Sequence, residues 1–202
     1  MWNYEKRLQF PVKIDCVCPE AAQVIISQLG GPDGEIAASM RYLNQRYSMP
    51  DRRIAGLLTD IGTEELAHME MVAAMIHQLT KGMSDEDVKR AGMDIYFVDH
   101  TAGVWPQAAS GTPFQASFFQ SKGDAITDLF EDLAAEQKAR TTYDNILRLV
   151  DIPDVREPIK FLRQREITHF QRFGEALRLL QEDLDHRNFY AINPSYDPIP
   201  QK

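Results

Sequence analysis

The 202-residue sequence contains only two cysteines, Cys16 and Cys18, in a Cys-Val-Cys triplet near the N-terminus. Cysteines this close rarely form a disulfide with each other, and there is no second pair to complete a four-cysteine metal site. We therefore expect two reduced thiols, with a crosslink between chains as the alternative.

Long apolar runs and basic clusters are also absent. No apolar stretch is long enough to span a membrane, and residues 1–7 lack the apolar core of a signal peptide. We expect synthesis in the cytoplasm without export by the general pathway. The net charge of −8, with no basic block, argues against nucleic acid as a partner. The length and the hydrophobic fraction of 44% are consistent with one globular domain.

A repeated pattern of glutamate and histidine is present instead. Glu35 precedes the segment Glu65-Leu66-Ala67-His68 by 30 residues, and Glu136 precedes Glu166-Ile167-Thr168-His169 by the same 30 residues. The second set repeats the first at an offset of 101 residues. Residues three apart on an α-helix share a face, so each Glu-x-x-His pair points one way.

The midpoint of each 30-residue interval resembles a turn: Pro50 follows Ser48-Met49, and Asp151 lies beside Pro153. In an antiparallel helical hairpin, residues equidistant from the turn lie at the same height. The spacing therefore predicts an all-α four-helix bundle in which two hairpins bring four carboxylates and two imidazoles to one level. A single Glu-x-x-His is usually a solvated pair, but coincidence does not also supply two equal hairpins with turns at both midpoints.

The rest of the chain divides around these hairpins. We expect a single domain made of an extended N-terminal arm (1–18), a first hairpin (19–81), a crossover (82–121), a second hairpin (122–185) and a C-terminal tail (186–202). Two hairpins of this kind require one long crossover, which is also placed to line an access route to the site. Both terminal segments carry aromatic residues, so the arm should lie on the body or on another subunit, and the tail should wrap around a neighbouring subunit.

Two tyrosines follow the repeat. Tyr42 comes seven residues after Glu35, and Tyr143 comes seven residues after Glu136. Residues seven apart on a helix are about 20° out of register, so we expect each tyrosine beside the glutamate of its own helix.

Four carboxylates in an apolar bundle repel one another unless they take up protons or bind metal. Two divalent ions would cancel four negative charges and stabilise the fold. Hard carboxylates with one imidazole per metal suit manganese or iron better than zinc. A paired redox centre exchanges two electrons without releasing a radical, which suits peroxide or dioxygen as a substrate.

Residues 19–182 resemble the manganese catalases, and more closely their shorter relatives in bacterial spore coats. The resemblance rests on Gly30-Gly31-x-x-Gly34-Glu35, Tyr42, Glu64-Glu65-Leu66-Ala67-His68, Gly111-Thr112-Pro113-Phe114, Ala135-Glu136-x-x-Ala139-Arg140 and Arg165-Glu166-Ile167-x-His169. It implies a ferritin-like bundle with two manganese ions that disproportionates hydrogen peroxide to water and oxygen. It also implies a homo-oligomer, commonly a hexamer, located in the spore coat with other coat proteins.

The resemblance also implies roles for the site residues. Glu35 and His68 would ligate one manganese, Glu136 and His169 the other, and Glu65 would bridge them. Spacing alone makes Glu166 a further ligand, whereas the resemblance places it near the bridging solvents, where it shuttles protons; both roles stay open. Tyr42 matches a tyrosine just outside the metal ligands.

Two other functions remain open: a mainly structural coat protein whose metal stabilises the fold, and a di-iron oxidase or iron-handling protein of the same fold. The chain has Ala135 where some catalases carry an arginine that guards the substrate channel, and its tail is shorter than theirs. These departures concern turnover and channel selectivity more than metal binding.

Overall fold

The computed structural model describes residues 3–185 and Tyr196, so the predicted C-terminal tail lies outside the described residues except for Tyr196. Within the described part the chain is helical, and its only β-type pairing is an isolated bridge between Gln107 and Pro113. In chain order the elements are α1 (Pro19–Ile25), α2 (Ser27–Gly30), α3 (Glu35–Gln45), η1 (Arg46–Ser48), α4 (Arg52–Thr80), α5 (Asp85–Ala91), α6 (Asp94–His100), η2 (Ala116–Phe119), α7 (Ala125–Leu149) and α8 (Pro153–Asp185).

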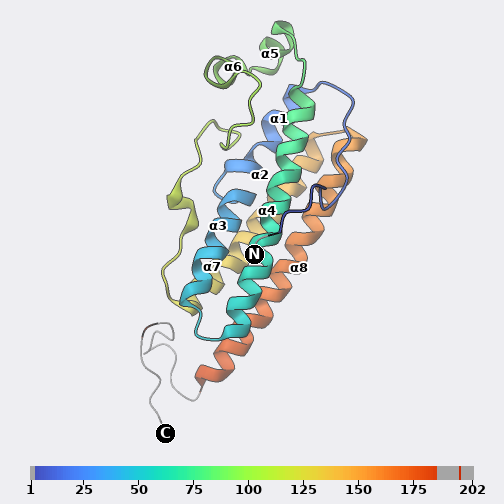
Figure 1. The fold of residues 1–202 in the computed structure, drawn as a ribbon. Helices are drawn as coiled ribbons and strands as arrows, with labels where there is room; N and C mark the ends of the chain where they lie inside the picture. Colours follow the sequence, from blue (N-terminus) through green and yellow to red (C-terminus); the bar gives the residue numbers. More distant parts are fainter. Residues whose placement is uncertain (1–2, 186–195, 197–202) are drawn as a thin grey trace.

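The long helices form two antiparallel hairpins, α3 with α4 and α7 with α8, and the predicted all-α four-helix bundle is confirmed (Figure 1). The crossover returns along the length of the bundle before α7 begins. As a result α3 and α8 run in one direction while α4 and α7 run in the other. No helix in residues 3–185 combines the length and the apolar character needed to cross a membrane.

Acidic N-caps start two of the long helices. Asp51 accepts a hydrogen bond from the backbone N–H of Arg53 at the start of α4, and Asp124 accepts one from Thr127 at the start of α7. Ser48 closes η1 three residues before Asp51, so α4 begins only after the turn at Pro50.

The glycine-rich break before α3 is required by close packing. A Cβ atom on Gly30 would lie 2.3 Å from the backbone N of Gln107, and one on Gly34 would lie 2.7 Å from the carbonyl oxygen of Ser27. Real Cβ atoms do not approach backbone this closely. The glycines therefore let the crossover lie against the end of α2 and place Glu35 as the first residue of α3.

The apolar core consists of two clusters at different heights of the bundle. The upper cluster in Figure 1 includes Ile25, Met75 and Ile159, and the lower one includes Leu58, Leu129 and Phe173. On α4 the lower cluster ends at Ile61 and the upper one begins at Met71. The predicted metal residues of α4 lie between these two positions, so the site separates the two clusters.

The N-terminal arm lies on the body of its own chain from Leu8 onward. Phe10 stacks on Phe161 of α8 with ring centroids 5.0 Å apart, and Gln78 of α4 bonds the backbone of Val12 and Ile14. This contact satisfies the expectation that the arm cannot bury itself alone. Cys16 is exposed, Cys18 is partly buried, and neither forms a disulfide within the described chain.

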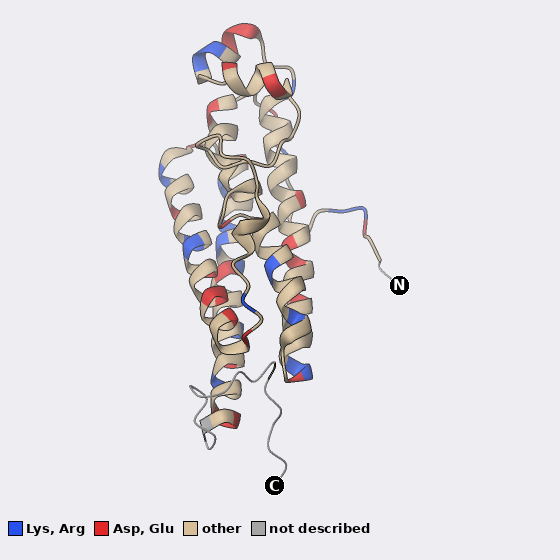
Figure 2. Ribbon diagram, turned by 90° about the vertical axis from the view of Figure 1, so that its left-hand side faces the viewer, with Lys and Arg blue, Asp and Glu red and all other residues tan. Residues whose placement is uncertain are grey.

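The crossover contains two short α-helices, α5 and α6, and the 3-10 helix η2, and otherwise follows an irregular path down the bundle. Arg41 of α3 fixes its lower part, since the guanidinium Nε donates to the carbonyl of Phe119 at 2.8 Å and Nη2 donates to that of Phe118 at 2.7 Å. Charged residues of both signs are interspersed along the helices that Figure 2 shows.

Candidate metal centre

The structure brings the six predicted residues together in the middle of the bundle. They come from α3, α4, α7 and α8, and none is more than 3% exposed. Their ligand atoms form two overlapping groups, each within a 4.8 Å span. The first group contains Glu35, Glu65, His68 and Glu166, and the second contains Glu65, Glu136, Glu166 and His169.

Glu65 occupies the centre of the arrangement. Its Oε2 lies 2.7 Å from Nδ1 of His68, and its Oε1 lies 2.7 Å from Nδ1 of His169. Each imidazole also faces one further carboxylate, with Glu35 3.9 Å from His68 and Glu136 3.5 Å from His169. A carboxylate whose two oxygens face two separate sets of ligands has the geometry of a bridge between two metals.

The two tyrosines do not pair with the glutamates that the heptad spacing predicted. The hydroxyl of Tyr42 on α3 donates to Glu136 on α7, and that of Tyr143 on α7 donates to Glu35 on α3. The prediction that each tyrosine lies beside the glutamate of its own helix was wrong. Because α3 and α7 run antiparallel, a side chain seven residues further along one helix reaches back toward the glutamate of the other.

Glu64 supports both histidines from the outer side of the centre. It accepts a hydrogen bond from Nε2 of His169 at 3.1 Å and lies 3.6 Å from Nε2 of His68. The Glu64 carboxylate is itself held in place, because Oε1 accepts hydrogen bonds from Nε of Arg165 and from Nε2 of Gln9, each at 2.7 Å. A carboxylate bonded to the outer nitrogen of an imidazole fixes which nitrogen faces the metal. The motif analysis included Glu64 but assigned it no role, since a Glu-Glu pair does not show which member faces inward.

Burial and crowding set the protonation of the acids. Burial and the charge of Glu65 raise the pKa of Glu35 well above its usual 4.5, and burial and the charge of Glu136 do the same for Glu166. Burial also opposes ionisation of Glu65, but the adjacent charges of His169 and His68 outweigh it and hold its pKa well below 4.5. Without metal, the site therefore combines an acidic Glu65 with the carboxyl groups of Glu35 and Glu166, which hold protons more strongly than free glutamates do.

The imidazoles respond to the same charges. Burial opposes the protonation of His68, but Glu65 and Glu64 together raise its pKa from 6.5 to about 9. Glu65, Glu136 and Glu64 raise the pKa of His169 further still against the same burial. Both imidazoles must lose a proton to bind metal through Nδ1, so metal competes with protons at this site.

Unpaired buried atoms show that the residues fit a metal. Glu136 Oε2 and Glu166 Oε1 are buried without a hydrogen-bond partner among the described residues, and Glu65 Oε1 and His169 Nδ1 are 2.7 Å apart but outside hydrogen-bond geometry. All four residues belong to the candidate ligand groups. Buried polar atoms are rarely left unpaired, and this set of oxygens plus one imidazole per group matches what manganese or iron binds.

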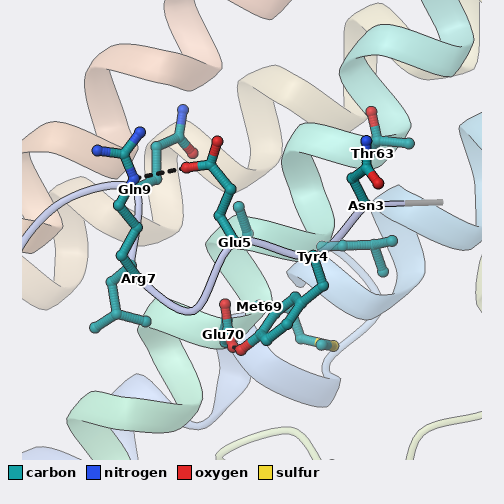
Figure 3. Close-up of a pocket in the computed structure, with 11 residues that line it drawn as sticks. Asn3, Tyr4, Glu5, Arg7, Gln9, Thr63, Met69 and Glu70 are labelled. Carbon is teal, nitrogen blue, oxygen red and sulfur yellow. Dashed lines mark hydrogen bonds and ion pairs between the residues drawn. The ribbon is translucent and has the colours of Figure 1, made fainter.

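A hollow of about 580 Å³ lies away from this centre, between the N-terminal arm and the outer face of α4 (Figure 3). Tyr4 and Glu70 meet across it, and Leu66 and Met69 supply much of its apolar lining. None of the six candidate metal residues lines it. The candidate metal residues therefore lie inside the bundle and not at this surface hollow.

Comparison with known proteins agrees with this geometry. The family model described as manganese containing catalase matches residues 1–189. The chain belongs to the manganese catalase family. It is 50% identical over 190 residues to protein CotJC of Bacillus subtilis, covering 94% of this chain and 100% of that one. It is 35% identical over 199 residues to a probable manganese catalase of Clostridium acetobutylicum, covering 96% and 88%.

A solved structure extends the likeness to three dimensions. The crystal structure of KatB, a manganese catalase from Anabaena, superposes with a TM-score of 0.83 at 28% identity, covering 100% of this chain and 85% of that one. The predicted ferritin-like fold is thereby confirmed. As a member of the manganese catalase family, this chain carries the dimanganese type of centre that the buried carboxylate and histidine groups can hold.

Proposed function

We propose that the protein disproportionates hydrogen peroxide to water and oxygen at a dimanganese centre held by Glu35, Glu65, His68, Glu136 and His169, with Glu166 close enough to be a sixth ligand. The observation that carries this proposal is the position of Glu65 between two imidazoles, with a further carboxylate facing each of them. Membership of the manganese catalase family supports the choice of metal.

Two manganese ions would supply the two-electron chemistry, and the protein residues would supply positions and protons. Glu65 holds the two halves of the site together. Glu166 has a raised pKa and an unpaired Oε1 that faces the cluster, so it can hold a proton at that oxygen and release it to a neighbouring oxygen. Tyr42 and Tyr143 restrain one oxygen of Glu136 and of Glu35, which leaves the other oxygen of each carboxylate to ligate.

The test is oxygen evolution from hydrogen peroxide by protein produced in manganese-rich medium, normalised to bound manganese. We expect oxygen release that scales with manganese content and is lost in Glu65→Ala. Bound manganese without oxygen release would contradict the proposal, as would a fully active Glu65→Ala protein. Ample iron with little manganese would favour the di-iron oxidase function.

We further propose that the protein acts as a homo-oligomer, with a hexamer as the family resemblance suggests, in the spore coat. A mainly structural coat role is the second candidate, and the exposed apolar residues of α6 favour it, since Ile95 and Val98 are each 82% exposed. Removing residues 1–7 together with 186–202 tests that role. An oligomer that persists after both deletions, measured by light scattering, would count against assembly through these segments.

A further inference from the structure

A row of buried acids leads along one face of α7 from the surface to the metal centre. Asp128, Asp132 and Glu136 are spaced four residues apart, so they lie on one face of the helix, and their exposed fractions are 0%, 0% and 1%. Only Glu136 belongs to the candidate metal site. The function proposed above leaves Asp128 and Asp132 without a role.

The opposite wall of this row is polar as well. Arg41 and Gln45 of α3 are each 1% exposed, and both act on Asp132 by lowering its pKa against the larger effect of burial, which raises it. Arg41 uses two of its nitrogens to hold the crossover, which leaves Nη1 without a partner. A purely structural anchor accounts for the first two nitrogens but not for the third.

Five buried atoms in this group have no hydrogen bond of normal geometry among the described residues, although Gln45 lies close enough to Asp132 to lower its pKa. They are Arg41 Nη1, both amide atoms of Gln45 and both carboxylate oxygens of Asp132. Arg41 and Asp132 form no ion pair within 4.0 Å of each other. Buried donors and acceptors are normally satisfied by protein or by ordered water, and opposed polar groups beyond hydrogen-bond range are commonly bridged by water. The set offers donors and acceptors together, which suits a small neutral molecule carrying hydroxyl groups.

The outer end of the row lies next to residues that line a surface hollow. Asp128 accepts hydrogen bonds from the backbone N–H groups of Lys122 at 2.7 Å and Gly123 at 3.0 Å. Lys122 and Thr127 line a hollow of about 570 Å³ on the crossover side of α7. Successive members of the row are about 6 Å apart along the helix. One water molecule spans such a gap with two hydrogen bonds of about 2.8 Å each.

The internal repeat shows that the bundle does not need these polar groups for packing. At the offset of 101 residues, Thr142 stands in the place of Arg41, Ile146 in the place of Gln45, and Gly31 in the place of Asp132. The opposite side of the centre lacks the charged groups, although the buried Gln28 lies beside Tyr143 there with its Nε2 unpaired among the described residues. The buried Arg41 and Asp132 therefore occur on one side of the repeat only.

We propose that Asp128, Asp132, Arg41 and Gln45 form a hydrated polar conduit that carries water and hydrogen peroxide between the hollow at Lys122 and the Glu136 side of the centre. We name it the α7 conduit. The part that involves peroxide depends on the function proposed above, whereas the hydration of the conduit does not. The inner end of the conduit lies beside the hydrogen bond from Tyr42 to Glu136. A molecule that passes Asp132 would therefore reach the metal centre at Glu136.

The decisive variant is Gln45→Leu with Asp132→Leu, which leaves Arg41 and its hydrogen bonds to the crossover in place. Leucine is close in volume to both residues, so the substitutions remove polar atoms without opening a large cavity. With wild-type manganese content, we expect kcat/KM for hydrogen peroxide to fall about tenfold, the effect of losing one or two hydrogen bonds to the passing molecule. We expect kcat at saturating peroxide to fall less than kcat/KM.

The matched control is Arg140→Met with Asp144→Leu, which removes an ion pair of 2.7 Å from the same helix away from the conduit. Its kcat/KM should remain at the wild-type value. An unchanged kcat/KM in the conduit variant, with manganese bound, would overturn the proposal. A fall of equal size in the control variant would do the same.

A high-resolution crystal structure of the wild-type protein supplies a readout that does not depend on activity. We expect ordered water bonded to Arg41 Nη1, to Gln45 and to Asp132. A dry cluster would overturn the conduit even if the protein is a catalase. If manganese-loaded protein releases no oxygen, the proposed function fails, and the water positions still decide whether the conduit exists.

Discussion

The hydroxyl of Tyr42 donates to Glu136 on the opposite hairpin, and Tyr143 makes the reciprocal bond to Glu35. Burial raises the pKa of both tyrosines well above 10.0, so each stays a donor at physiological pH. The two hairpins are therefore tied together by hydrogen bonds at the carboxylates that face the metals.

Tyr42→Phe should reduce turnover without removing the metal. The variant frees one oxygen of Glu136 from its restraint, and loss of a hydrogen bond to a ligand typically costs about 10- to 100-fold in activity or affinity. The measurement is oxygen evolution per bound manganese. Tyr143→Phe is the matched variant at Glu35, and a normal rate in both variants would show that these bonds serve packing alone.

Glu64→Gln should weaken both halves of the centre at once. The amide oxygen of the new glutamine can still accept a hydrogen bond from a histidine. It has no negative charge, so it holds the rings of His68 and His169 less firmly in the orientation that binds metal. We expect manganese affinity or activity to fall about 10- to 100-fold, measured by metal titration and oxygen evolution. Glu70→Gln on the outer face of α4 is the control, and an equal loss in that variant would remove the special role of Glu64.

Removing the metal should destabilise the protein. Manganese binds the folded site and not the scattered ligands of the unfolded chain, so a metal concentration of about 100 times Kd adds about 2.7 kcal/mol to the free energy of unfolding. Thermal unfolding of metal-free and manganese-loaded protein measures the difference. Identical melting temperatures for the two forms, with binding verified by metal analysis, would contradict a site formed by these residues.

The metal-free protein should lose stability as the pH rises. The pKa of His68 is 6.5 in the unfolded chain and about 9 in the folded protein. Its contribution to the free energy of unfolding is therefore complete below pH 6.5 and is lost as the pH rises through about 9. The pKa values of Glu35 and Glu166 in the folded protein lie above 4.5. Their contribution to the free energy of unfolding is therefore also lost as the pH rises above 4.5. We expect a lower melting temperature at about pH 9 than at about pH 6, and a stability that increases over this interval would refute the assignment.

Gly30→Ala should destabilise the fold by about 1–3 kcal/mol, because the added Cβ would lie 2.3 Å from the backbone of Gln107 and the crossover must shift. Gly56→Ala on the exposed face of α4 meets nothing within 4 Å and should instead stabilise the helix by up to about 1 kcal/mol. Chemical denaturation measures both. A neutral Gly30→Ala would show that the crossover is not held against α2.

The sequence predicts the metal centre well because its information is periodic. Equal intervals around two turns place Glu35, Glu65 and their repeats at one height, and helix geometry alone then makes them meet. The partner of Tyr42 was mispredicted because a heptad defines a direction on one helix and not which neighbouring helix supplies the acceptor.

Other features were missed for a related reason. Asp128, Asp132 and Arg41 are residue types that are usually solvated, yet all three are buried. Arg41 and Asp128 hydrogen-bond backbone groups of the segment 118–123, a contact that no pattern in the sequence indicates. The role of Glu64 depends on Gln9 and Arg165, which come from the arm and from α8. Contacts among three distant segments leave no periodic trace in a sequence.

The division of the core into two apolar clusters bears on how the protein comes apart. Between Ile61 and Met71, and at the same level of the other helices, buried acids replace hydrophobic contacts. Without metal, this level joins the two hydrophobic blocks through ionisable polar groups and not through apolar contacts. Bound metal ions would therefore make the two ends of the bundle unfold together. The rate of amide hydrogen exchange around Glu65 should fall when metal binds, so it would report metal occupancy.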